Sequence, residues 1–284
     1  MRRMNVIKLS RVAAVVSVLY IAAACAGVPG TVFEYERTGR EQGLDYTFTG
    51  SSEPYLKELA DFVDLGSIIA DAGNDLERTA LITGYVSGLW NHDSRNTPSS
   101  NDPLTILREV KEGERFRCVE YSIVLHGLLS ALDIPCRFIN LRQLQPELTN
   151  DAHVVCEVFL RDLRRWILVD PQWNRIPIIR EIPASTVELQ QAVASADSNI
   201  SYYGKGRDSR YTRWMARYLV YMHTNPDCRV GVTSFNHKNI LLVPVNAPIP
   251  AYLSKWHAEN KYEISRSSIV TNNIDLFYSP PVSR

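Results

Sequence analysis

The chain has 284 residues, enough for one substantial hydrophobic core or two modest ones. Hydrophobic residues make up 45% of it and charged residues 22%, a balance that excludes a largely disordered chain. Its formal net charge of +0 argues against a nucleic-acid-binding protein, because such binding relies on neutralising phosphates.

The chain begins with the features of a secretory signal sequence. A basic start precedes a short apolar stretch over 12–24, whereas a bilayer-spanning helix needs roughly 20 apolar residues. The stretch ends in "IAAACAG", with small residues directly before Cys25; this resembles a bacterial lipobox, except that Ala22 replaces the usual leucine. We therefore expect 1–24 to be a signal peptide that is removed and Cys25 to carry a lipid. An ordinary A-x-A signal with an incidental cysteine is the alternative.

Removal of this signal would change the charge and the setting of the protein. It would delete four basic and no acidic residues, so 31 basic residues would become 27 against 31 acidic ones, a net of −4. The protein would then lie in the bacterial cell envelope, held to the membrane by its N-terminal lipid alone. The four cysteines after Cys25 form no C-x-x-C pair, which disfavours a zinc site, and we expect no metal or other cofactor. One disulfide among Cys136, Cys156 and Cys228 stays open in such a compartment.

The N-terminal half is predicted to be helical. Residues 25–50, rich in Gly, Thr and Glu, are expected to form a tether after the lipid anchor. Apolar residues at three- and four-residue spacing over 53–90 predict helices, and the Asn-, Asp-, Ser- and Pro-rich segment 91–103 predicts a loop. Asp102 is expected to cap a short helix that begins at Pro103.

The middle of the chain predicts one helix followed by strands. A helix begins at Cys118 and ends before Pro135; it is apolar nearly all round, so it should be central and buried. Residues rich in β-formers predict strands over 136–142, 153–160 and 166–170, the last two joined as a hairpin.

The C-terminal part has a weaker pattern. It predicts helices over 185–196 and 209–223 and strands over 239–245, 262–271 and 276–278. We expect a core domain over 51–175 and treat 176–284 as a helical and β elaboration of the same domain.

Three residues of the middle segment form a pattern typical of nucleophilic catalysis. A thiol attacks as thiolate, and a helix N-terminus and a neighbouring histidine both lower its pKa; Cys118 has the first by position. His153 begins one strand of the hairpin and Asp170 ends the other, so the hairpin brings imidazole and carboxylate to one rim of the sheet. The carboxylate would orient the imidazole, and the imidazole would activate the thiol.

The hairpin turn decides whether this pairing is geometrically allowed. Side chains alternate across a sheet, so a four-residue turn at 161–164 places Asp170 opposite Val155, on the same face as His153. A five-residue turn without a bulge would place Asp170 on the wrong face.

The order of these motifs resembles a known family. A cysteine at the start of a helix that leads into "ALDIPCRF", then "HVVCEV" and "WILVDP", is similar to the transglutaminase-like superfamily over 101–174. The resemblance implies a papain-like α+β fold, in which a central helix carrying the cysteine packs on an antiparallel sheet carrying the histidine and the aspartate. It also implies a Cys118–His153–Asp170 triad and acyl transfer through a thioester. The sequence departs at Phe116, where many members have glycine.

The residues around this pattern have less specific roles. The backbone N–H of Cys118 is one candidate oxyanion donor, and Trp90, Asn91 or Asn101 is a candidate for the second. Glu157 supports the structure or contacts substrate, and we favour support.

A thiol-dependent envelope enzyme acting on proteins or peptides is the reading that these residues favour. Water as acceptor would make it a peptidase or amidase, an amine would make it a cross-linking enzyme, and we favour water because it is always present. A non-catalytic binding or scaffold lipoprotein that keeps the fold is the alternative. Other Cys-His enzymes are disfavoured because the nucleophile lies in "FRCVE" rather than "DCSG" or "RGGxC".

Overall fold

A computed structural model describes residues 32–37, 44–231 and 238–281. The expected signal peptide over 1–24 and the expected lipid attachment at Cys25 lie outside the described residues. Within the described ranges, no helix has both the length and the apolar character needed to cross a membrane.

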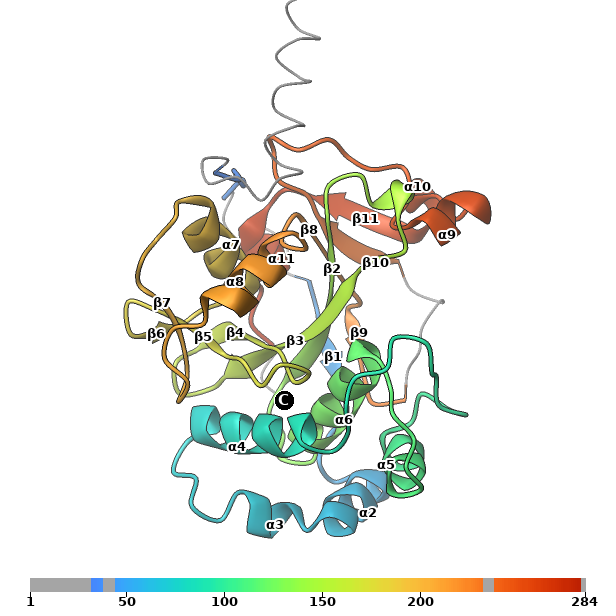
Figure 1. Cartoon of the computed structure of the whole chain (residues 1–284), viewed down its shortest axis with the longest axis vertical. Helices are drawn as coiled ribbons and strands as arrows, with labels where there is room; N and C mark the ends of the chain where they lie inside the picture. The colour runs from blue at the N-terminus through green and yellow to red at the C-terminus, as the bar shows by residue number, and fades with distance from the viewer. Residues whose placement is uncertain (1–31, 38–43, 232–237, 282–284) are drawn as a thin grey trace, which may run out of the picture.

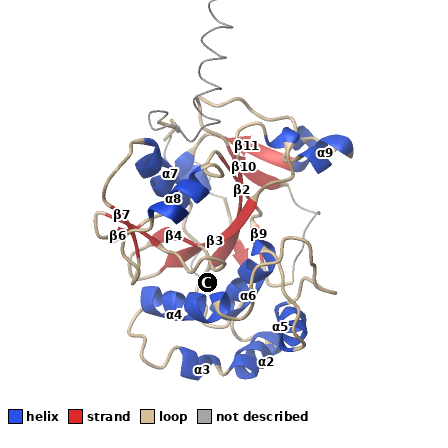
Figure 2. Cartoon of the chain, in the orientation of Figure 1, coloured by secondary structure: helices blue, strands red, loops and turns tan. Residues whose placement is uncertain are grey.

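A six-stranded sheet runs through the middle of the molecule, with helices on both of its faces (Figures 1 and 2). Its strand order is β11-β10-β8-β2-β3-β4, antiparallel except for the parallel edge pair of β10 and β11. The strands are β2 (Cys136–Arg142), β3 (His153–Leu160), β4 (Arg165–Val169), β8 (Tyr221–Thr224), β10 (Asn239–Leu242) and β11 (Ser268–Thr271).

The N-terminal helices cover one face of this sheet, as the spacing of apolar residues predicts. They are α2 (Pro54–Val63), α3 (Leu65–Ile68), α4 (Asp75–Ser87), α5 (Pro103–Lys111) and α6 (Cys118–Ser130). Asp102 caps α5 by accepting the backbone N–H of Thr105 at 2.8 Å, which confirms the predicted cap. Helix α6 lies on β3, surrounded by α2, α4 and α5, because its side chains are apolar on nearly every side. The central helix packed on a largely antiparallel sheet confirms the predicted α+β class.

The hairpin of β3 and β4 has the register that a four-residue turn predicts. Leu160 pairs with Arg165 and Cys156 with Val169, so the next position along β4, Asp170, lies opposite Val155. This parity places the side chains of His153 and Asp170 on one face of the sheet. The predicted register is confirmed.

The other face is covered by the C-terminal part, in which two predictions hold and three need correction. Helix α7 (Thr186–Ala194) and strand β10 are confirmed. The predicted helix over 209–223 is wrong after α8 (Ser209–Ala216), because 221–224 leave the helix to pair as β8 between β2 and β10. The predicted strand over 262–271 is wrong before β11, since 264–267 form α10 (Ile264–Ser267). The predicted strand over 276–278 is wrong: Asn273 caps a short helix there, α11 (Ile274–Phe277).

The remaining elements are short. They are β1 (Thr47–Phe48), η1 (Pro146–Leu148), β5 (Pro177–Ile179), β6 (Ile182–Pro183), β7 (Ile200–Tyr202), β9 (Asp227–Cys228) and α9 (Lys255–Glu259). Strand β1 lies in the segment expected to be a tether, pairs with β9 and follows the buried side chain of Tyr46. Upstream, Glu36 pairs with Asn273. The described parts of the expected tether are therefore bonded to the fold, since their apolar side chains reach the C-terminal segment.

The four cysteines of the described residues, Cys118, Cys136, Cys156 and Cys228, form no disulfide. Cys136, Cys156 and Cys228 are buried. Burial raises the pKa of Cys136 well above its ordinary value, and a hydrogen bond with Cys156 raises it further. These buried thiols are core residues, and Cys118 is the partly exposed one.

Candidate active site

The loop before α6 is fixed by hydrogen bonds that position Cys118 as the first residue of the helix. The carbonyl of Phe116 accepts the indole N–H of Trp90 at 3.1 Å and the backbone N–H of Asp93 at 2.9 Å. Phe116 itself is fully buried in the core between the helices, so a bulky residue anchors the loop where many relatives have glycine. At the third helical position, Glu120 accepts the backbone N–H of Arg117 at 3.0 Å and closes the first turn.

His153 and Asp170 form a buried pair at the rim of the sheet. The Nε2 atom of His153 lies 2.7 Å from Oδ2 of Asp170, and the two side chains are 2% and 0% exposed. The other carboxylate oxygen of Asp170 accepts the backbone N–H groups of Gln172 and Trp173 at 3.1 and 3.2 Å. The turn after β4 therefore holds the carboxylate in place, and the carboxylate in turn orients the imidazole.

The second nitrogen of His153 faces the nucleophile. Asp170 occupies Nε2, which leaves Nδ1 as the nitrogen that is free to interact with the nearby thiol of Cys118. Burial lowers the pKa of His153, but the charge of Asp170 and hydrogen bonds to Asp170 and Cys118 outweigh it and raise that pKa to about 10. At neutral pH this imidazole therefore holds a proton. The three residues singled out in the sequence thus meet in space.

Aromatic residues from α8 and from the turn that follows it enclose the pair, and the sequence pattern did not reveal them. The hydroxyl of Tyr211 donates to Oδ2 of Asp170 at 2.8 Å. The ring of Trp214 stands edge-on to His153 at 4.8 Å, and Tyr218 follows at 5.9 Å. The fold alone brings α8 to β3, so only its apolar spacing could have been noticed in the sequence. This wall keeps water from the histidine–aspartate hydrogen bond.

The candidate oxyanion donors differ in whether the structure leaves them free to bind a ligand. The N–H groups of the first turn of a helix have no partner within it, so the backbone N–H of Cys118 stays available as an oxyanion donor. The indole of Trp90 already donates to Phe116, which makes its assignment as a second donor wrong. Asn91 is exposed, and Asn101 lines a cavity that begins beside Cys118, at Val119.

Other candidate residues have structural partners. The Nε2 atom of His126 contacts the carbonyl of Cys228 at 2.9 Å in the core, as expected of a packed residue. Glu157 is fully buried and accepts from Arg137 at 2.6 Å and from the backbone of Thr186 at 2.9 Å. This confirms the favoured structural role of Glu157.

The described residues contain no cluster of three or more His, Cys, Asp or Glu side chains that could hold a metal ion. The site brings together a thiol, an imidazole, a carboxylate and the backbone N–H donors of a helix start. Together they can perform acyl transfer.

Comparison with known proteins bears on the core of the chain. Residues 65–171 match the family model described as the transglutaminase-like superfamily, and this stretch contains Cys118, His153 and Asp170. No curated protein matches the chain significantly.

Two solved structures resemble the chain at low identity. One is described as a candidate cysteine protease from Cytophaga hutchinsonii, with 17% identity and a TM-score of 0.34 over 66% of this chain and 60% of that protein. The other is described as a candidate protease from Parabacteroides distasonis, with 14% identity and a TM-score of 0.30 over 43% of this chain and 27% of that protein. The chain spans less than two thirds of either length, and likenesses of this size carry no conclusion about activity.

The family match and the observed α+β fold agree on the same core. Residues 65–171 therefore match the transglutaminase-like superfamily in sequence, and this stretch contains the central helix and the hairpin of the observed fold.

Proposed function

We propose that the protein is a thiol-dependent hydrolase of peptide or carboxamide bonds, with Cys118 as nucleophile, His153 as proton carrier and Asp170 as the group that orients it. One observation carries the proposal: the buried imidazole of His153 is bonded to the buried carboxylate of Asp170 through Nε2, and the nearby thiol of Cys118 helps to raise its pKa. A histidine held only for packing has no need of a buried carboxylate on one side and a half-buried thiol on the other.

The first half of the reaction forms a thioester. The thiol proton of Cys118 passes to His153, and the thiolate attacks the substrate carbonyl to give a tetrahedral oxyanion. The backbone N–H of Cys118 lies where it can stabilise that oxygen, in the positive field of the first turn of α6. His153 then donates its proton to the departing amine as the C–N bond breaks.

The second half releases the acid. Neutral His153 takes a proton from water, and the resulting hydroxide attacks the thioester carbonyl. The C–S bond breaks, the carboxylic acid leaves and the thiolate–imidazolium pair is restored. An amine in place of water would give transamidation, and we favour hydrolysis because water is always present outside the cell whereas amine acceptors are scarcer.

Alkylation of the thiol at pH 6 tests this proposal. An ordinary thiol is only on the order of 0.3% thiolate at that pH. Cys118 should therefore react with iodoacetamide far faster than the buried cysteines, and one label per chain should map to it by mass spectrometry. His153→Ala should slow labelling and abolish turnover of a thiol-reactive ester with little change in melting temperature, since a rim residue contributes little to the core. Labelling of Cys118 at the rate of a simple thiol would reject the enzyme and favour a binding protein that keeps the fold.

We further propose that the enzyme works in the bacterial cell envelope, held by a lipid on Cys25. The basic start, the short apolar stretch and "AAAC" support this location. The wild-type protein, expressed in bacteria, should partition into the detergent phase, and Cys25→Ser should move to the aqueous phase. Equal partitioning of the two proteins into the aqueous phase would contradict the anchor.

A further inference from the structure

An arginine at the end of β2, Arg142, directly follows Leu141, the residue that pairs with His153 of the candidate site. Among the residues that the structure describes, Arg142 forms no ion pair, and its Nε atom is buried without a hydrogen-bond partner. A guanidinium removed from water normally gains a carboxylate or several acceptors in exchange. Arg142 is only partly buried and has neither, so its outer nitrogens remain open to an anionic ligand from solvent.

The surroundings of Arg142 point to Cys118. Burial lowers the pKa of Arg142 to about 10, and the nearby charges that oppose this effect are those of Cys118 and then Asp151. The carboxylate of Asp151 already accepts the hydroxyl of Tyr218 at 2.9 Å and lies 3.9 Å from Arg217. Asp151 therefore already has partners of its own, and Arg142 has no ion-pair partner among the described residues.

A cavity of about 230 Å³ continues this polar surface along the same face of the sheet. Side chains alternate along a strand, so Arg142 and Asn140 of β2 share a face, and Asn140 pairs with His223 of β8. Asn140 and His223 both line the cavity, which reaches α6 at Val119. The Nε2 atom of His223 is buried without a partner. Two neighbouring polar side chains of this face thus lack the hydrogen bonds that burial demands.

We propose that Arg142 binds a carboxylate of the acyl substrate beside Cys118, with Asn140 and His223 lining the cavity that receives the rest of the substrate. This rests on the proposed function of Cys118. A carboxylate matches the planar donor fork of arginine better than a neutral group does. The site would therefore select peptides in which a carboxylate lies next to the bond that is cleaved.

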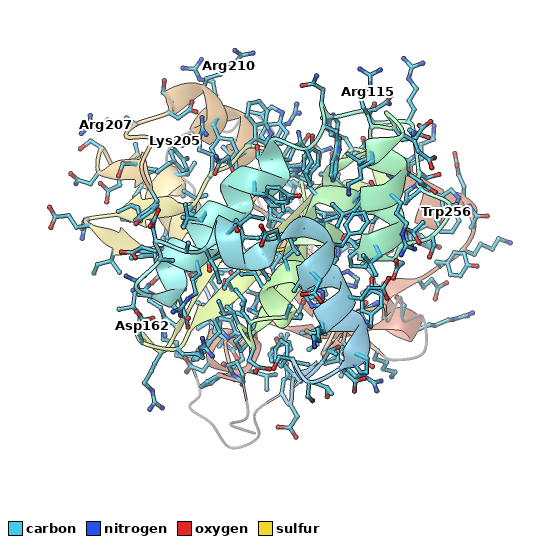
Figure 3. All side chains as sticks on the ribbon, turned by 90° about the horizontal axis from the view of Figure 1, so that it is seen from below. Arg115, Asp162, Lys205, Arg207, Arg210 and Trp256 are labelled. Atoms are coloured by element: carbon cyan, nitrogen blue, oxygen red, sulfur yellow. The ribbon has the colours of Figure 1, made fainter. Side chains whose placement is uncertain are left out.

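Other cations on the surface are compatible with an anionic substrate. Arg115 precedes Cys118, and Arg210 belongs to α8, the helix that covers His153. Figure 3 shows Arg115 and Arg210 along one edge of the molecule, with Lys205 and Arg207 near Arg210. These exposed side chains would steer an anion rather than bind it, because water screens them.

A pair of alkylating reagents of nearly equal size tests the proposal on the nucleophile itself. Iodoacetate and iodoacetamide both transfer a CH₂ group to the thiolate, with formation of the C–S bond and loss of iodide, but only iodoacetate carries a carboxylate. The imidazolium of His153 also attracts anions, so the ratio of the two rates is compared between wild type and Arg142→Gln. We expect the substitution to lower the iodoacetate-to-iodoacetamide ratio by about tenfold, as for loss of a charged hydrogen bond, and to change the iodoacetamide rate little.

Two controls separate Arg142 from the general charge of the surface. Arg229 lines the cavity too, but its guanidinium lies 2.7 Å from Asp227, so Arg229→Gln should lower the ratio by less than twofold. Arg180, exposed and paired with Asp197, supplies a distant control in Arg180→Gln. The proposal is overturned if Arg229→Gln lowers the ratio as much as Arg142→Gln does, or if Arg142→Gln leaves the ratio unchanged. In either case, rapid labelling of the wild type by iodoacetamide would still support Cys118 as the nucleophile. Slow labelling by both reagents in wild type instead rejects the proposed function.

The carboxylate that Arg142 binds could be the C-terminus of a peptide or an acidic side chain, and two series of substrates distinguish them. One series compares peptides with a free C-terminal carboxylate and with a C-terminal amide; the other compares Glu and Gln next to the cleaved bond. We expect Arg142→Gln to lower kcat/KM about tenfold for one of the carboxylate-bearing substrates and hardly at all for its amide counterpart. An equal loss on all four would mean that Arg142 acts on the oxyanion or the thiolate, which would also overturn the proposal.

Discussion

His153 carries its charge because of two neighbours, and this sets the pH range of the site. The pKa of His153 is about 10, above the ordinary value of 6.5, because Asp170 and Cys118 outweigh the effect of burial. Protonation of His153 therefore stabilises the fold; the contribution is complete below about pH 6.5 and is lost as the pH rises through about 10. In the proposed reaction, the departing amine takes this same proton.

We expect turnover to fall on the alkaline side with an apparent pKa near 10, the value for His153. A pH–rate profile of kcat/KM on a peptide amide measures this limb, with circular dichroism at each pH to show that the protein stays folded. Because the leaving amine is the group that needs the proton, the alkaline decrease in kcat/KM should be smaller for an activated ester. If kcat/KM on the amide already falls near pH 7, a group other than His153 loses the essential proton.

Asp170 tests whether the third member of the triad acts on the reaction. In Asp170→Asn the amide can still accept from the backbone of Gln172 and Trp173, but it cannot balance the charge on His153. The equivalent substitution in a serine-protease triad costs about 10⁴ in turnover, and a cysteine–histidine pair that already holds its charges should suffer less. We expect a loss on the order of 10²-fold in kcat with the variant folded. A loss smaller than threefold would reduce the site to a Cys118–His153 dyad.

At the scale of elements, helix α6 is held in place by contacts that leave no room at one of its positions. A Cβ atom on Gly127 would lie 2.8 Å from Cδ2 of Leu59 and 2.8 Å from Cγ of Pro103. Glycine thus allows α2 and α5 to approach the central helix closely. The cost is helix propensity, about 1 kcal/mol relative to alanine.

Gly127→Ala should destabilise the protein by about 1–2 kcal/mol, because overpacking outweighs the better helix former. Gly84→Ala in α4 is the matched control: its Cβ would meet only Nδ2 of Asn174, at 3.6 Å, so it should be neutral or slightly stabilising. Urea unfolding of both variants measures the difference. If both variants gain stability, the packing around α6 is looser than these distances imply.

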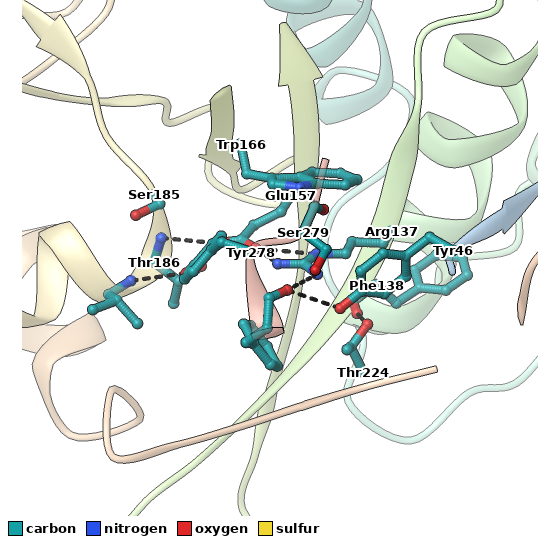
Figure 4. A network of polar contacts seen from close by, with 12 residues as sticks. Tyr46, Arg137, Phe138, Glu157, Trp166, Ser185, Thr186, Thr224, Tyr278 and Ser279 are labelled. Carbon is teal, nitrogen blue, oxygen red and sulfur yellow. Dashed lines mark hydrogen bonds and ion pairs between the residues drawn. The ribbon is translucent and has the colours of Figure 1, made fainter. Parts of the chain in front are cut away.

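At the scale of the whole molecule, a buried arginine ties the end of the chain to the central sheet (Figure 4). Arg137 is fully buried, bonds to Glu157 at 2.6 Å and donates to the carbonyl of Phe277 at 2.7 Å. Its guanidinium lies over the rings of Trp166 at 4.4 Å and Tyr46 at 4.8 Å. Tyr46 near the start of the described chain and Phe277 near its end therefore both contact Arg137, although both are far from Cys118 in sequence.

Removing that charge alone should be costly. Arg137→Met leaves Glu157 charged and buried, with a predicted loss of about 3–5 kcal/mol in the free energy of unfolding. Adding Glu157→Gln removes the second charge while an amide oxygen still accepts from Thr186, so the double variant should recover more than half of the loss. Chemical denaturation of the wild type and the three variants forms the cycle. A double variant less stable than Arg137→Met would show that the carboxylate is needed for its other contacts.

The sequence by itself determined the parts that depend on local chemistry. Asp102 caps α5, α6 begins at Cys118, and a four-residue turn sets the register that aligns His153 with Asp170. Caps, apolar periodicity and turn length act within a few residues, so they can be recognised in the amino-acid sequence. These local features were enough to predict that a helix begins at Cys118 and that His153 and Asp170 lie together on one face of the sheet.

Only the tertiary structure decided which distant residues surround them. Tyr211 reaches Asp170 from a helix some forty residues away in the chain, and 221–224 become a strand because β2 and β10 offer hydrogen bonds on both sides. The incomplete partners of Arg142 and the bonds of Glu157 likewise arise from the packing of separate elements. Such contacts depend on how the layers stack, and propensity is a weak guide where burial and strand pairing outweigh it.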